Sequence, residues 1–186
     1  HHDYSFRAAL PALEALEGAA IPVMAATSKT RLEVQELRRQ LGNHHPFIVE
    51  NGAAIVIPAG YFPSRPADTL ERDGCWVREL GAPRQRWLQL LASLEGAFGG
   101  DFEYFARAGV EGIAAMTGLS QEQAARANRR EYSEPVQWLG SAARKRDFIA
   151  ALRAGGATVL EGGRFLTVAG DSDKGRALAW LRGEKG

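Results

Sequence analysis

A chain of 186 residues with 45% hydrophobic content is long enough for one sizeable core, or for a core with a smaller second unit. Its 23 Lys and Arg residues nearly balance its 22 Asp and Glu residues, which gives neither the basic excess of a nucleic-acid binder nor an acidic tail. The single cysteine, Cys75, excludes an internal disulfide, and no apolar run fits a membrane span or a signal peptide. These properties favour a cytoplasmic protein with a small-molecule ligand, no nucleic-acid partner and no membrane contact. They leave the oligomeric state open.

The first part of the chain predicts alternating helices and strands, which is typical of a largely parallel sheet with crossover helices. Apolar residues recur at helical spacing over residues 5–16, and Ser5 is placed to cap that helix. The next expected elements are a strand at 21–26, a helix that Thr30 caps and Gly42 ends, and buried strands at 46–49 and 53–57. This unit has the length of a βαβ crossover.

The regular pattern lapses over residues 63–81, which is the expected domain boundary, with one strand at 75–80. Beyond it we expect a helix from Pro83, strands at 102–105, 132–139 and 157–160, and helices at 110–117, 121–130 and 142–154. The strand at 164–168 and the helix at 174–181 are expected to return to the first unit. The predicted division is therefore a core at 1–81, an inserted α/β cap at 82–161 and a core return segment at 162–186.

Two polar clusters follow expected strands, where the ligands of open α/β sheets bind. Thr27-Ser28-Lys29-Thr30 offers hydroxyls, a cation and free helix N-terminal amides, which suit a phosphate or a carboxylate. The alternative is that Ser28 and Thr30 only cap the helix while Lys29 is solvated. Glu50-Asn51-Gly52 is also the signature of a plain hairpin turn.

Two later segments are weaker candidates. Lys174 opens the last expected helix, where its charge opposes the helix dipole and would suit an anion, although an exposed side chain is the commoner explanation of one such lysine. Arg129-Arg130 precedes a polar strand and could face a ligand, but paired arginines are commonly a solvated helix end. No His, Cys, Asp or Glu grouping has metal-ligand spacing, and no Ser/His/Asp order is evident.

The order of four segments is more specific than any one of them. ATSKTRLEV, PFIVENGAAIVIPAGYF, TGLSQEQAARANRREYSEPVQW and GGRFLTVAGDSDKGRAL together resemble the mannosyl-3-phosphoglycerate phosphatase family of the haloacid dehalogenase (HAD) superfamily. The resemblance covers nearly the whole chain. By this resemblance, residues 1–5 match the loop that follows the family's first motif. We therefore interpret His1 and His2 as native sequence and not as the remnant of a purification tag.

The resemblance implies a Mg²⁺-dependent phosphomonoesterase with a Rossmann-like core and an α/β cap of C2 type. It would convert mannosyl-3-phosphoglycerate to mannosylglycerate through an aspartyl-phosphate. By the same resemblance, Thr27 holds the transferring phosphoryl group and Lys174 neutralises its charge. The expected substrate-binding residues are Ser28, Lys29 and Asn51 in the core, with Arg130, Ser133, Glu134 and Arg164 as contacts to the glycerate carboxylate or sugar hydroxyls.

The sequence departs from the family pattern in one respect. Neither the family's Asp-x-Asp-Gly-Thr motif nor its Gly-Asp-x-x-Asn-Asp motif occurs in the 186 residues, and Asp171 and Asp173 match the loop before the third motif. The nucleophile, the general acid and the magnesium ligands are therefore not in this sequence. We expect the 186-residue polypeptide alone to be inactive. Another HAD sugar phosphatase and a non-catalytic phosphate-binding fragment remain alternatives.

Overall fold

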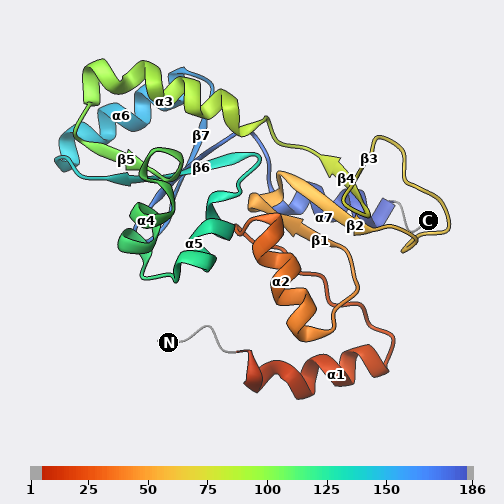
Figure 1. Ribbon diagram of the computed structural model, residues 1–186. Coiled ribbons are helices and arrows are strands. Elements are labelled where there is room, and N and C mark those ends of the chain that lie inside the picture. Colours follow the sequence, from red (N-terminus) through yellow and green to blue (C-terminus); the bar gives the residue numbers. More distant parts are fainter. Residues whose placement is uncertain (1–5, 184–186) are drawn as a thin grey trace.

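Two four-stranded sheets organise the chain, in a computed structural model that describes residues 6–183 (Figure 1). The first sheet has the order β1-β2-β4-β3, and the second has the order β5-β6-β8-β7. Every pairing within both sheets is antiparallel. The strands are β1 (Phe47–Val49), β2 (Ala54–Pro58), β3 (Leu70–Arg72), β4 (Cys75–Glu79), β5 (Phe102–Tyr104), β6 (Ser133–Trp138), β7 (Thr158–Glu161) and β8 (Leu166–Ala169).

Alternating side chains place one helix on each face of the first sheet. Phe47 pairs with Val56 on the face that packs against Val34 of α2 (Arg31–Leu41). Ile48 pairs with Ile55 on the opposite face, which packs against Leu181 of α7 (Lys174–Gly183). Successive side chains of a strand point to opposite faces of the sheet. Since a helix covers each face, both faces are apolar, and the strands therefore have continuous hydrophobic sequences. This half therefore has three layers.

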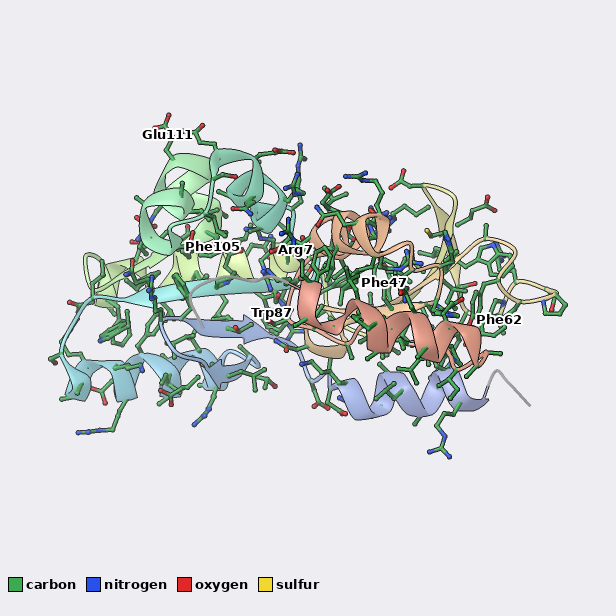
Figure 2. All side chains as sticks on the ribbon, turned by 90° about the horizontal axis from the view of Figure 1, so that it is seen from below. Arg7, Phe47, Phe62, Trp87, Phe105 and Glu111 are labelled. Carbon is green, nitrogen blue, oxygen red and sulfur yellow. The ribbon has the colours of Figure 1, made fainter. Side chains whose placement is uncertain are left out.

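Four helices surround the second sheet: α3 (Arg84–Phe98), α4 (Phe105–Thr117), α5 (Gln121–Asn128) and α6 (Ala142–Ala154). Helices α3 and α6 bury Trp87, Leu91 and Phe148 against strand residues such as Phe102. Helices α4 and α5 form a separate apolar cluster on the other side of the sheet (Figure 1). The labelled side chains show the two halves, with Phe47 in the first, Phe105 in the second and Trp87 near their junction (Figure 2).

The expectation of a largely parallel sheet is wrong for the described residues. The segment expected as a strand at 21–26 is extended without being a strand, and its one parallel contact is a bridge from Ala26 to Ile48. Strand β1 instead turns back on β2, because the residues between them form the short helical turn η2 (Glu50–Gly52) and leave no room for a crossover. The mixed α/β fold itself agrees with the expected class.

The strand expected at 164–168 forms as β8, but it pairs with β6 and β7 in the second sheet. The chain thus returns to the first sheet only with α7, later than the expected return at 162. Hydrophobic periodicity identifies a strand without identifying its neighbour, which explains the difference. The division of the chain into domains stays a prediction.

The remaining elements differ in detail from their expected bounds. The N-terminal helix is a short η1 (Arg7–Ala9) followed by α1 (Leu10–Gly18), and the expected cap Ser5 lies outside the described residues, as do His1 and His2. Strand β3 was not expected from the sequence. Cys75 is buried, as a small apolar residue would be. No helix within residues 6–183 is long and apolar enough to cross a membrane.

Candidate active site

The loop from Thr27 to Thr30 lies between the extended segment and α2. The Thr27 amide donates to the Ile48 carbonyl at 3.1 Å, which fixes the loop at the end of β1. The Thr27 hydroxyl accepts the Lys29 amide at 3.2 Å, and Thr30 forms a capping box with Glu33 at the start of α2. The capping interpretation is therefore correct for Thr30. It does not account for Thr27, whose hydroxyl lies outside the helix.

Turn η2 lies beside this loop and is held to it by backbone hydrogen bonds. The Glu50 amide donates to the Lys29 carbonyl at 3.1 Å, and the Asn51 amide donates to the Thr27 carbonyl at 2.9 Å. Glu50, Asn51 and Gly52 all have positive φ, at 46°, 60° and 96°. The hairpin interpretation of this turn is correct, and the turn also borders the Thr27 loop. Binding of a ligand by this turn stays a prediction.

The same turn meets the start of α7. A Cβ added at Gly52 would lie 2.6 Å from the Lys174 nitrogen, so the turn and the start of the helix are in direct contact. The Asp173 carboxylate accepts the Arg176 amide at 2.8 Å and caps the helix, and this hydrogen bond, with the Arg176 side chain, lowers the pKa of Asp173. Within residues 6–183, neither the Asn51 side chain nor the Lys174 ammonium makes a hydrogen bond or an ion pair. Both remain able to bind an anion.

Residues 130–133, between α5 and the start of β6, contact the Thr27 loop and η2. Arg130 donates from Nη2 to the Ser28 carbonyl at 2.7 Å and from Nε to the Ser133 hydroxyl at 3.1 Å. Ser133 in turn donates to the buried Glu50 carboxylate at 2.5 Å. The structure therefore brings Arg130 to the loop that carries Thr27, although the two are about a hundred residues apart in sequence.

Ser133 and Glu134 are both fully buried. Glu134 accepts hydrogen bonds from the Arg84 guanidinium and from the Ala106 amide, all within the second half of the chain. Neither side chain is accessible to solvent, so this geometry does not support a direct substrate contact for either. Their expected role in substrate binding stays a prediction.

Arg164 lies on the opposite side of a cleft from the core residues. A cavity of about 760 Å³ runs between α2 and the second half of the chain, with Lys29 and Glu33 on one wall and Arg126, Arg164 and Phe165 on the other. Lys29 is paired with Glu33 at 3.0 Å, and Arg164 donates to the Met116 carbonyl at 3.4 Å. Lys29 and Arg164 thus face one cavity, while Thr27, Asn51 and Lys174 are not among its lining residues.

Sequence reasoning missed the acidic and basic residues that join the two halves. The sequence identifies Glu50 only as part of a turn, although a carboxylate directly after a buried apolar strand is a signal that it has internal partners. Arg31 pairs with Asp73 at 2.8 Å and with Glu131 at 3.2 Å, and nothing in its local sequence indicated these partners.

This chain is similar to known proteins in sequence and in fold. No protein-family model matches. The chain is 35% identical to the glucosyl-3-phosphoglycerate/mannosyl-3-phosphoglycerate phosphatase of Methanococcoides burtonii over 97% of its length and 66% of that protein. It is 37% identical to the mannosyl-3-phosphoglycerate phosphatase of Pyrococcus horikoshii over 93% of its length and 68% of that protein. The chain therefore spans about two thirds of the relatives that it matches.

Solved structures share the fold at low sequence identity. A haloacid dehalogenase-like hydrolase from B. subtilis matches with a TM-score of 0.57 at 14% identity, covering 94% of this chain and 70% of that one. A HAD superfamily phosphatase from Bacteroides thetaiotaomicron matches with a TM-score of 0.60 at 16% identity, covering 96% of this chain and 65% of that one. The architecture is that of the HAD phosphatases, with a Rossmann-like core and a cap. With the sequence relatives above, this chain belongs to the mannosyl-3-phosphoglycerate phosphatase family.

Proposed function

We propose that this chain is part of a phosphomonoesterase that removes phosphate from a sugar-3-phosphoglycerate, with mannosyl-3-phosphoglycerate as the preferred substrate. The observation that carries the proposal is the contact of the Thr27 loop, turn η2 and the start of α7, the three segments that carry Thr27, Asn51 and Lys174. A hydroxyl, an amide and an ammonium group are all suited to binding phosphate. The names of the relatives supply the sugar-phosphoglycerate part. A cytoplasmic location, suggested by the single cysteine, is part of the same proposal.

The chemistry of this site is positioning and charge neutralisation. The Thr27 hydroxyl donates to an oxygen of the transferring phosphoryl group, and the Asn51 amide donates to a second substrate oxygen. The Lys174 ammonium neutralises negative charge on that group. Charge in a phosphoryl-transfer transition state is spread over the phosphoryl oxygens, so fixed donors around them lower the barrier.

The sugar and glycerate parts of the substrate occupy the cleft between the two halves in this proposal. Lys29 lines this cleft and Arg164 lies across the cavity from it. Ser28 precedes Lys29 in the chain, and its carbonyl accepts a hydrogen bond from Arg130. A pocket of about 760 Å³ is in the size range of small-molecule sites. Ser133 supports Arg130 in this arrangement, and Glu134 supports the second half through Arg84.

Magnesium is expected from the family, but the described residues do not fit a magnesium site. Mg²⁺ prefers an octahedral set of oxygen ligands, usually including carboxylates. Residues 6–183 contain no group of three or more His, Cys, Asp or Glu residues placed to hold a metal. His45 is engaged elsewhere, with Tyr61 at 3.0 Å and Glu17 at 2.8 Å. The Mg²⁺ requirement therefore stays a prediction.

The test is a substrate panel, run with the full-length gene product and with the 186-residue chain beside it. Phosphate release is measured with and without Mg²⁺ from mannosyl-3-phosphoglycerate, from glucosyl-3-phosphoglycerate and from simple hexose phosphates. We expect the full-length product to prefer the two phosphoglycerates by at least about tenfold in kcat/KM, a difference that contacts to the glycerate carboxylate readily supply. A preference for hexose phosphates would replace this assignment by another HAD sugar phosphatase. Absence of turnover on every substrate, with phosphate binding retained, would favour the non-catalytic alternative.

A further inference from the structure

Glu50 carries a buried carboxylate whose partners all come from the other half of the chain. Its side chain is 1% exposed, at the point where β1 turns back on β2. It accepts the Glu131 amide at 2.8 Å, the Tyr132 amide at 3.2 Å and the Ser133 hydroxyl at 2.5 Å. A buried carboxylate without such donors would be very unfavourable. The turn alone needs only Asn51-Gly52, so it does not explain a glutamate here.

Arg130 connects this carboxylate to the Thr27 loop. Its Nε lies 3.7 Å from a Glu50 oxygen and donates to Ser133, while its Nη2 donates to the Ser28 carbonyl at 2.7 Å. The guanidinium is planar, so fixing Nε and Nη2 fixes the whole group. Its Nη1 makes no hydrogen bond with the residues that the structure describes. A donor of known orientation therefore lies next to the residue that follows Thr27.

The backbone of η2 orients the Glu50 side chain. Glu50 and Asn51 have φ of 46° and 60°, a region that residues with a Cβ avoid. Such conformations persist only where the surroundings hold them. Here they are held by the hydrogen bonds that the Glu50 and Asn51 amides donate to the Lys29 and Thr27 carbonyls. The same turn thus holds the Thr27 loop with its backbone and residues 130–133 with the Glu50 side chain.

A purely structural role is the plain alternative for Glu50, because other polar contacts also join the halves. The Arg31–Glu131 pair and the hydrogen bond from Thr30 to the Arg126 carbonyl are examples. Neither of these two contacts includes a guanidinium that is held against Ser28 and keeps an N–H group available for a ligand, as Arg130 does. The contacts of Glu50 extend through Ser133 to Arg130, so they bear on ligand binding and the other two contacts do not.

We propose that Glu50 is a positioning residue, which holds the Arg130 guanidinium against the Thr27–Lys29 loop so that a phosphate anion meets a cation already in place. This inference rests on one part of the proposed function, the binding of phosphate at this site, and does not depend on which sugar-phosphoglycerate is the substrate. Pre-positioned charge binds an anion more tightly than a mobile side chain, because no side-chain freedom is lost on binding. It also implies that Glu50 acts through Arg130 and has no contact of its own with the anion.

A double-mutant cycle tests this coupling, with inorganic phosphate as the probe and calorimetry as the readout. We expect Glu50→Gln to weaken phosphate binding about tenfold, and Arg130→Met to weaken it by at least as much, as for the loss of one charge-assisted hydrogen bond. The double variant should bind no more weakly than Arg130→Met alone, since Glu50 has no effect without Arg130. Glutamine matches glutamate in shape, so the packing is preserved.

Tyr132→Phe is the matched control. It removes the hydrogen bond from Tyr132 to Glu79 in the same segment without touching Arg130, so phosphate affinity should be unchanged. The Arg130 Nε–H resonance, assigned by its loss in Arg130→Met, should move in Glu50→Gln and stay in place in Tyr132→Phe. If Glu50→Gln does not fold, Ser133→Ala takes its place in the cycle, because it removes the hydroxyl that Arg130 and Glu50 share.

Three outcomes would overturn the proposal: no phosphate binding by the unaltered chain, equal binding by Glu50→Gln, or additive losses in the double variant. Additive losses would assign Glu50 an effect independent of Arg130, as a general structural role predicts. Phosphate is a product of every phosphomonoesterase, so a failed sugar-phosphoglycerate panel would leave this result standing. The two proposals therefore fail separately.

Discussion

Gly52 lies directly against the backbone of Asp173, so that turn η2 and the N-terminus of α7 touch without any side chain between them. A Cβ at Gly52 would meet the Asp173 carbonyl group and lie 2.6 Å from the Lys174 nitrogen. Gly52 also has a φ of 96°, which side-chain-bearing residues rarely adopt. The glycine is therefore needed twice, for the turn and for the approach of Lys174 to Asn51.

Gly52→Ala should separate these two elements. We expect a loss of at least about 2 kcal/mol in the free energy of unfolding, because strain at positive φ adds to a clash with rigid backbone. Gly60→Ala is the control, since Gly60 has a φ of 82° with no atom within 4 Å of an added Cβ. It should lose about 1 kcal/mol, from backbone strain alone. Urea denaturation measures both, and equal losses would contradict the close approach.

Lys174 is expected to supply the main free positive charge of the phosphate site. Lys174→Met should weaken the binding of inorganic phosphate about tenfold, and Lys174→Arg should weaken it less because the charge remains. Lys145→Met is the control, because Lys145 is paired with Glu161 at 2.9 Å in the second half of the chain. Titration calorimetry at low ionic strength compares the variants. Unchanged affinity in Lys174→Met would remove this residue from the proposed site.

Thr30 differs from Ser120 although both form capping boxes, with Glu33 and Gln123 respectively. The Thr30 hydroxyl also donates to the Arg126 carbonyl of the other half at 2.9 Å, and Thr30 is fully buried. Thr30→Ala should therefore lose about 2 kcal/mol in the free energy of unfolding, against about 1 kcal/mol for Ser120→Ala. Thr30→Ser keeps the hydroxyl and should remain near the original stability. Equal losses for the two alanine variants would show that the contact between the halves contributes nothing.

The local signals were reliable wherever one residue type decides the conformation. The sequence predicts Thr30 as a helix cap and Gly42 as a helix stop, and it predicts α6 with its observed bounds. Thr27, Asn51 and Lys174 could be selected by resemblance because each lies in a short recognisable segment. Their meeting through Gly52 depends on an approach between distant segments, which periodicity does not encode.

The errors concern partners that lie far apart in the sequence. The sequence predicts that the residues of β8 return to the first sheet, whereas they pair with β6 in the second, and it does not identify Glu50 as the acceptor for residues 131–133. A buried carboxylate looks the same in sequence as an exposed one until its donors are known. Glu134 shows the converse, because a polar residue on a candidate ligand-facing strand proved to be fully enclosed. Both outcomes follow from tertiary packing.

Tyr132 should make the stability of the protein sensitive to alkaline pH. Burial first, and then the hydrogen bond to Glu79 at 2.7 Å, raise the pKa of Tyr132 well above its usual value of 10.0. The unfolded chain therefore releases this proton at a pH where the folded chain keeps it, which favours unfolding. The free energy of unfolding should fall as the pH rises above about 10, where an unperturbed tyrosine begins to ionise.

Tyr132→Phe removes the ionisable group and should flatten this fall. It should not abolish the fall, because burial also raises the pKa of Tyr61 and Tyr104. Urea denaturation of both proteins at several pH values between about 8 and 11 gives the two slopes, on either side of the tyrosine pKa. Identical slopes would mean that the Tyr132 hydroxyl is as accessible to solvent in the folded chain as in the unfolded one. That result would contradict the packing of residues 130–133 against the first half of the chain, on which the position of Arg130 depends.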